Sequence, residues 1–74
     1  MNLNEFTNLN LTTGANISYD LIANDLDGKQ LILKNYKGIF LKKKKQYIAI
    51  LNSAKVYDWF HLNNIHEIRI EEII

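Results

Sequence analysis

The chain has 74 residues, a length typical of a single small domain, here spanning residues 1–74. It contains no cysteine, which excludes disulfides and thiolate metal sites, and its hydrophobic content of 47% is that of a globular chain rather than a disordered one. The formal net charge of +1 argues against a partner held by overall charge. No apolar run approaches the ~20 residues that span a bilayer, so we expect a cytoplasmic protein with no membrane contact.

Residues 1–14 predict an N-terminal arm or short helix. Asn2 and Glu5 have the spacing of a capping box, in which each side chain binds the other residue's backbone N–H. Further on, the alternation of Leu9 and Leu11 with polar residues favours an extended chain instead. We expect a short helical turn followed by an irregular run to Gly14.

Five short runs with strand-like alternation follow, separated by turn signals. Asp27-Gly28 suits a turn that needs a positive φ, and Gly38 within the second run indicates a bulge or a sharp bend. Asn63-Asn64 forms a two-residue corner that directs Ile65 into the core. The expected strands cover about residues 17–22, 31–41, 47–51, 56–62 and 66–71, and residues 42–46 and 52–55 form the remaining hairpin turns.

This pattern predicts an all-β fold: a small five-stranded SH3-like or Sm-like barrel with a short N-terminal helix or arm. In such a barrel one long strand bends to serve both halves of the sheet. The expected core is Ile17, Tyr19, Leu21, Leu31, Leu33, Ile39, Ile48, Ile50, Phe60, Leu62, Ile65, Ile68 and Ile70.

The run from Val56 to Leu62 contains the first candidate site. Successive side chains of a strand point to opposite faces, so Tyr57, Trp59 and His61 share one face while Val56, Phe60 and Leu62 share the other. Exposed aromatic residues are typical of protein interfaces and of sheets that stack bases. The alternative is that Trp59 packs under the N-terminal segment. We favour a protein-binding role for this row.

Lysines in the middle of the chain form the second candidate site. Residues 29–45 hold seven lysines and no acid, whereas the flanking stretches are acidic. Lysines on a hairpin tip bind phosphates without sequence preference, but they also serve simply to solubilise a turn and block strand pairing, which is the interpretation we favour. The nucleic-acid alternative assigns the contacts to Lys34, Lys37, Lys42, Lys43, Lys44 and Lys45.

No residue cluster indicates catalysis, a metal site or a cofactor. His61 and His66 lie on either side of the predicted corner, so we expect their side chains not to converge on one metal ion. His61 and Asp58 are three apart in a strand and therefore face opposite ways, which argues against an acid–base pair. We expect a protein that is not an enzyme.

Two families share parts of this pattern. Lys37-Gly38-Ile39, Tyr47-Ile48-Ala49-Ile50 and the run from Phe60 to Ile68 resemble the YolD-like family of small β-rich proteins, although Asn64 stands where that family has an acid and its longer N-terminal helical segment is missing. The spacing from Asp27-Gly28 through Tyr47 to Leu62-Asn63-Asn64-Ile65 is similar to the Rof-type Sm-like proteins. The first resemblance implies contacts with DNA-repair polymerases in low-GC bacteria and phages, and the second implies inhibition of a transcription terminator.

We therefore expect a non-enzymatic protein-binding regulator or inhibitor. The abundance of Asn, Lys and Ile fits an AT-rich genome, so the chain is expected to be phage- or plasmid-encoded and to act on host DNA or RNA machinery or on a defence nuclease. The alternative is a nucleic-acid-binding barrel that uses Lys42–Lys45. Self-association is compatible with both, because the basic middle could pair with the acidic C-terminal stretch and Ile73-Ile74 form an apolar strand end.

Overall fold

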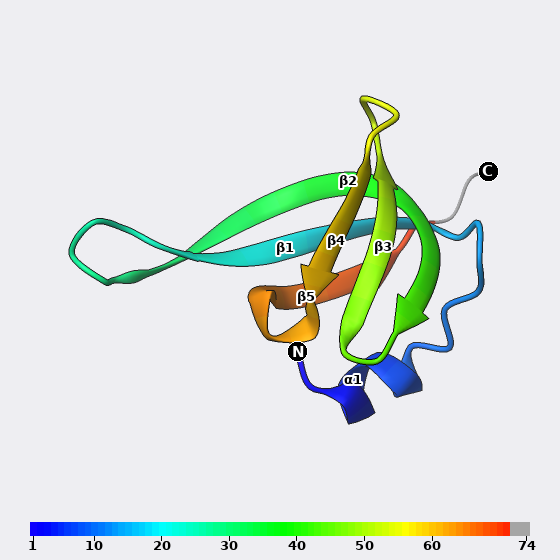
Figure 1. The fold of residues 1–74 in the computed structure, drawn as a ribbon, viewed down its shortest axis with the longest axis horizontal. Coiled ribbons are helices and arrows are strands. Elements are labelled where there is room, and N and C mark those ends of the chain that lie inside the picture. Colours follow the sequence, from blue (N-terminus) through cyan, green and yellow to red (C-terminus); the bar gives the residue numbers. More distant parts are fainter. Residues whose placement is uncertain (72–74) are drawn as a thin grey trace.

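The computed structural model describes residues 1–71, which form a five-stranded antiparallel sheet preceded by a short helix (Figure 1). The strands are ordered β4-β3-β2-β1-β5 across the sheet. The expectation for Ile73 and Ile74 falls outside the described residues. The elements are α1 (Leu3–Asn8), β1 (Asn16–Asn24), β2 (Gln30–Lys44), β3 (Tyr47–Asn52), β4 (Tyr57–His61), the 3-10 turn η1 (Leu62–Asn64) and β5 (Ile65–Ile70).

The helix α1 begins as the sequence predicts. Asn2 Oδ1 accepts a hydrogen bond of 2.8 Å from the Glu5 backbone N–H, and Glu5 Oε1 accepts one of 3.3 Å from the Asn2 N–H. One helical side chain, Phe6, is buried, and its ring lies 5.8 Å from that of Phe40 in β2. The helix therefore covers one end of the sheet (Figure 1). Within the described chain, no helix has the length and apolar character needed to cross a bilayer.

The long strand β2 bends and pairs with β1 along its first part and with β3 along its second. Gly38 lies at the crossover, paired with Ile17 on one side and Asn52 on the other. A Cβ atom there would lie 2.5 Å from Ile50 Cγ2 and 2.8 Å from the Leu51 backbone oxygen, so only glycine fits so close an approach of β3. The strand β2 curves along its length (Figure 1), and its bulge against β3 occurs at Leu41, between the paired residues Phe40 and Lys42.

The predicted five-stranded β fold with a short N-terminal helix is confirmed, and the strand pairing among the described residues leaves the sheet open. β4 and β5 are the two edges of the sheet, and no strand pairing between residues 1 and 71 joins them. The chain passes from one edge to the other through η1, where the Leu62 N–H donates to the Gln46 carbonyl oxygen at 2.8 Å. This contact ties η1 to the β2–β3 turn, and β5 continues along β1 without aligning with β4.

The core lies between the faces that the bent sheet turns inward. Ile48, Ile50 and Ile65 have no exposed surface, and Tyr19 is only 1% exposed. The complete buried apolar cluster is Phe6, Ile17, Tyr19, Phe40, Ile48, Ile50, Leu62, Ile65 and Ile68, with Leu21 and Phe60 partly buried against it.

Four residues of the expected core lie outside this cluster, and so does Val56, which was expected on the inner side with Phe60 and Leu62. Leu31, Leu33 and Ile70 are exposed by 44%, 38% and 52%, Ile39 is half-buried opposite Leu51, and Val56 is exposed. The first two belong to a hairpin that extends beyond the body of the sheet, because β5 pairs with β1 only as far as Leu21 and β3 pairs with β2 only from Gly38. Residues 22–33 therefore form a two-stranded projection, the β1–β2 arm (Figure 1).

Candidate site: an aromatic and lysine face

The outer face of β2, β3 and β4 brings the two predicted sites together. Residues directly opposite each other on neighbouring strands place their side chains on the same side of a sheet. The strand register gives three rows across the three strands: Ile39–Leu51–Tyr57, Lys42–Ala49–Trp59 and Lys44–Tyr47–His61. These residues, with Lys45 at the adjoining turn, are called the β2–β3–β4 face below.

The bulge at Leu41 determines which lysines belong to this face. Without it, simple alternation from Ile39 would put Lys43 on the outer side and Lys42 on the inner side. The extra residue reverses the alternation, so Lys42 and Lys44 lie opposite Ala49 and Tyr47. Lys43 takes the other side, where its Nζ donates a 2.9 Å hydrogen bond to the Lys45 carbonyl oxygen.

Trp59 occupies the centre of the face. Its neighbour across the strands, Ala49, has a small side chain that is 2% exposed, which leaves room for Trp59 and Lys42 to meet above it. The Lys42 Nζ atom lies 5.7 Å from the centroid of the Trp59 ring, within the range of a cation–π interaction. Trp59 is nevertheless 48% exposed, so it does not pack under the N-terminal segment, whose Phe6 contacts Phe40 instead.

A shallow hollow opens beside the Trp59 ring. It has a volume of about 400 Å³ and is lined by Lys44, Lys45, Tyr47 and Trp59; we call it the aromatic hollow. His61 supports one wall, because its ring meets that of Tyr47 edge-on at 4.9 Å. The His61 ring is itself oriented by a 3.0 Å hydrogen bond that its Nδ1 atom accepts from the Asn63 N–H.

The structure brings three of the six predicted lysines to the aromatic row. These are Lys42, Lys44 and Lys45, the last at the two-residue turn between β2 and β3 with a φ of +56°. Lys34 lies instead at the base of the arm, in the register shift of the β1–β2 pairing between Leu33 and Tyr36. Lys37 pairs with Ser18 of β1, further along β2.

The rows of the face contain no acidic residue, because the acids nearest in sequence point elsewhere. Asp58 lies opposite Ile50, on the inner side of the sheet, where one of its carboxylate oxygens accepts a 2.8 Å hydrogen bond from Asn52. His61 and Asp58 therefore face opposite sides, as predicted. No group of three metal-ligating side chains occurs within the described residues.

The side chain of Arg69, the one arginine of the sequence, links β5 to β1. Arg69 donates to both carboxylate oxygens of Asp20 at 2.8 and 3.0 Å and to Ser18 Oγ at 3.0 Å. The Arg69 guanidinium and the Asn35 N–H hold the pKa of the Asp20 carboxyl well below its usual range, because both bind the ionised form. The hydrogen bond to Asp20 in turn raises the pKa of Arg69.

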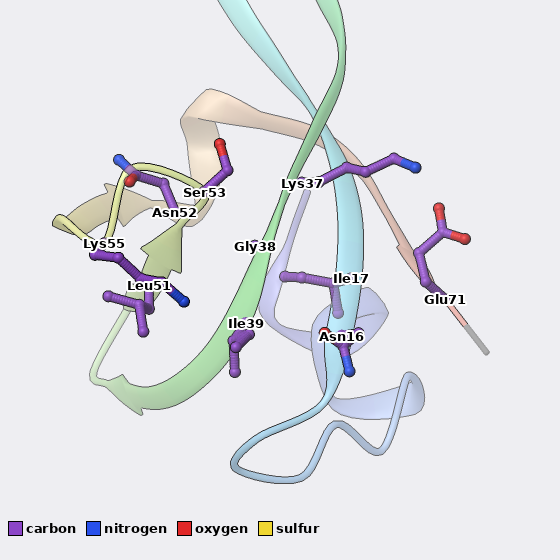
Figure 2. Close-up of a pocket in the computed structure, with 10 residues that line it drawn as sticks. All are labelled: Asn16, Ile17, Lys37, Gly38, Ile39, Leu51, Asn52, Ser53, Lys55 and Glu71. Atoms are coloured by element: carbon purple, nitrogen blue, oxygen red, sulfur yellow. The ribbon is translucent and has the colours of Figure 1, made fainter. Parts of the chain in front are cut away.

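A second hollow, of about 380 Å³, lies near the β3–β4 turn (Figure 2). Its walls include Lys37 and Lys55 but also Glu71, and its remaining lining is uncharged and contains no aromatic ring. The Lys37 and Glu71 side chains lie on the same side in Figure 2. Because its charges are of both signs, this hollow favours no one class of ligand.

Tyr47 is the site residue that sequence reasoning missed. It stands at the start of β3, where a single strand pattern gives no reason to connect it with the later row. The predicted hairpin between β3 and β4 could have located it. A short turn after Asn52 pairs Leu51 with Tyr57, and continuing this pairing along both strands brings Tyr47 opposite His61.

Comparison of the chain with protein-family models, with curated proteins and with solved structures finds no match. The resemblances to the YolD-like and Rof-type families therefore stay predictions that rest on the residue pattern.

Proposed function

We propose that the β2–β3–β4 face binds single-stranded nucleic acid. The observation that supports this most is the presence of Lys42, Lys44 and Lys45 beside the rings of Trp59 and Tyr47 on a face whose strand positions carry no acid. Aromatic rings on a sheet stack unpaired bases, each worth about 1–3 kcal/mol, while neighbouring ammonium groups bind the phosphates. Acids elsewhere in a nearly neutral chain weaken this interpretation when the sequence is considered alone. Among the described residues, however, none of the three rows of the face contains an acid.

The side chains on offer favour recognition that depends little on sequence. Arg69, the residue type that reads guanine edges with two parallel hydrogen bonds, is held by Asp20. Lysines act as point charges and rings stack on any base, so we expect similar affinity for mixed sequences and a strong dependence on salt. Bases buried in a duplex have no free faces to stack, so single strands should bind more tightly than duplexes.

The single tryptophan provides a direct assay of base stacking. Trp59 is the only Trp in the chain, so its fluorescence reports on this face alone. Titration with mixed-sequence single-stranded DNA and RNA oligonucleotides at low salt should quench it. Replacing Tyr57, which is 66% exposed and one row away, by Ala should weaken binding by about fivefold or more if that ring stacks a base.

Two variants serve as matched controls for that titration. Lys29→Gln removes one charge from the β1–β2 arm, and Val56→Ser removes an exposed apolar side chain that precedes β4. Both should leave the affinity nearly unchanged. Unquenched Trp59 fluorescence during saturating binding, or equal losses in control and site variants, would show that nucleic acid does not bind at this face.

A non-enzymatic protein-binding regulator is the second candidate function. Its support is the same row, in which Tyr57 and Trp59 are exposed and His61 is half-buried, together with the projecting β1–β2 arm, since exposed aromatics are enriched in interface hot spots. The partner would be a host protein of DNA or RNA metabolism or a defence nuclease, met in the cytoplasm by a phage- or plasmid-encoded chain. Nuclease-treated host lysate tests this: partners captured by the wild type but not by folded Trp59→Ala would favour it over nucleic acid.

We also propose that the sheet is an incompletely closed SH3-like or Sm-like barrel. The support is the number of strands, the continuous bend of β2 and the short η1 connection between the two edge strands. Nuclear Overhauser contacts in solution between backbone protons of β4 and β5 would establish closure. Their absence, with all other strand pairs present, would leave an open sheet.

A further inference from the structure

The β1–β2 arm has no support from the rest of the molecule. Its strands pair only with each other, and Leu31 and Leu33 are 44% and 38% exposed on the same side as Ala23 and Leu21. This side continues the inner face of the sheet past the end of the core. An isolated two-stranded hairpin is marginally stable in water, so contact with another molecule would stabilise the arm.

The tip of the arm has a distinctive chemistry. Leu26 is fully exposed, with a relative accessibility of 107%, and it stands between Asp25 and Asp27. Hydrogen bonds within the turn define its shape: Asp25 Oδ1 accepts from the backbone N–H groups of Asp27 and Lys29 at 2.9 and 2.8 Å. The tip therefore presents an apolar side chain flanked by negative charge. A complementary surface needs an apolar hollow bordered by cations.

The chain itself carries such a surface. The aromatic hollow has the rings of Tyr47 and Trp59 as walls and Lys44 and Lys45 at its border. A molecule cannot fill its own hollow, because its arm points away from the body while the β2–β3 turn lies toward the other side (Figure 1). We propose that the arm tip docks into the aromatic hollow of a second copy of this chain, with Leu26 against the rings and Asp27 near the lysines.

This contact places self-association and ligand binding on one surface. Leu26 of one copy would cover Trp59 of the other, so nucleic acid and the second copy would compete for the same rings. Self-association itself does not rest on the proposed function, since it needs only the arm and the hollow. It is measured in the absence of nucleic acid, so the failure of either proposal leaves the other open to test.

The experiment is sedimentation velocity over a concentration series at low salt, with Trp59 fluorescence recorded in parallel. The wild type should self-associate, more weakly at high salt, with a blue shift of Trp59 emission as the concentration rises. Leu26→Ser should weaken association by roughly tenfold or more, and Asp27→Asn should reduce its salt dependence. Both positions are exposed, and circular dichroism checks that the variants remain folded.

Val56→Ser, which removes an exposed apolar side chain outside the arm and the hollow, should associate like the wild type. Three results would overturn the proposal. They are a wild type that stays monomeric at high micromolar concentration, a Leu26→Ser variant that associates as tightly as the wild type, and association that leaves the Trp59 emission unchanged.

Discussion

Replacement of Gly38 by Ala should destabilise the fold strongly, although alanine is usually the better residue in an ordinary strand conformation. Where space allows, Gly→Ala stabilises by about 0.4–1 kcal/mol because the unfolded chain loses freedom. Here the new Cβ would lie 2.5 Å from Ile50 Cγ2 and 2.8 Å from the Leu51 oxygen, whereas carbon atoms prefer about 3.5–4.0 Å. The Leu51 oxygen belongs to the backbone of β3, so relief requires that β3 move away from β2.

Overpacking of this kind costs about 1–3 kcal/mol, and the backbone contact favours the upper half of that range. A loss of about 2 kcal/mol corresponds to a fall in Tm of roughly 8–16 °C for a domain of this size. Thermal unfolding followed by circular dichroism measures it. A Gly38→Ala variant as stable as the wild type, or more so, would refute the close approach of β3 at the bend.

Three further substitutions test separate parts of the structure. Ile65→Asp should unfold the chain in circular dichroism, because Ile65 has no exposed surface and an unpaired buried carboxylate costs several kcal/mol of a total of ~5–15 kcal/mol. Asp20→Asn should reduce the loss of unfolding free energy at acid pH, measured by urea unfolding at several pH values. Because Arg69 lowers the pKa of Asp20, the ionised carboxylate stabilises the fold above about pH 4, and this stabilisation is lost as the pH falls through the folded-state pKa. An unchanged dependence of stability on pH would contradict this. Lys45→Asn should stabilise by as much as ~1 kcal/mol, because Asn tolerates a φ of +56° better, yet weaken nucleic-acid binding; loss of stability would argue against strain at that turn.

Signals confined to a few neighbouring residues predicted local structure well. The capping box at Asn2 and Glu5 begins α1, and Gly28 has the positive φ, +82°, that the Asp-Gly turn implied. The turn after Asn52 is held by its own side chain, which accepts hydrogen bonds from the Ala54 and Val56 N–H groups. In each case the atoms that determine the conformation lie within four residues of one another.

Features that depend on where strands stop pairing were not predictable. The alternation that placed Leu31 and Leu33 in the core is the same whether a strand crosses a filled core or extends past it. Only the ends of β3 and β5 show that these residues lie in the arm. The burial of Phe40 likewise depends on Phe6, which approaches it from the far end of the sequence.

The candidate site was half predictable for the same reason. Strict alternation placed Tyr57, Trp59 and His61 on one face, and the register with β3 bears this out. Joining them to the lysines required the bulge at Leu41, which moves Lys42 to the outer side. A bulge is defined by how two strands pair, and nothing in the sequence of β2 alone predicts its position.

The most direct test of nucleic-acid binding at the β2–β3–β4 face is the salt dependence of its affinity for a mixed-sequence single strand. Each phosphate contact contributes about −0.7 to the slope of log affinity against log salt concentration, so contacts by Lys42, Lys44 and Lys45 predict a slope near −2. The triple Lys→Gln variant at these positions should bind weakly with a slope close to zero, while Lys29→Gln retains the wild-type slope. No detectable binding at low salt, or a triple variant with an unchanged slope, would contradict the account.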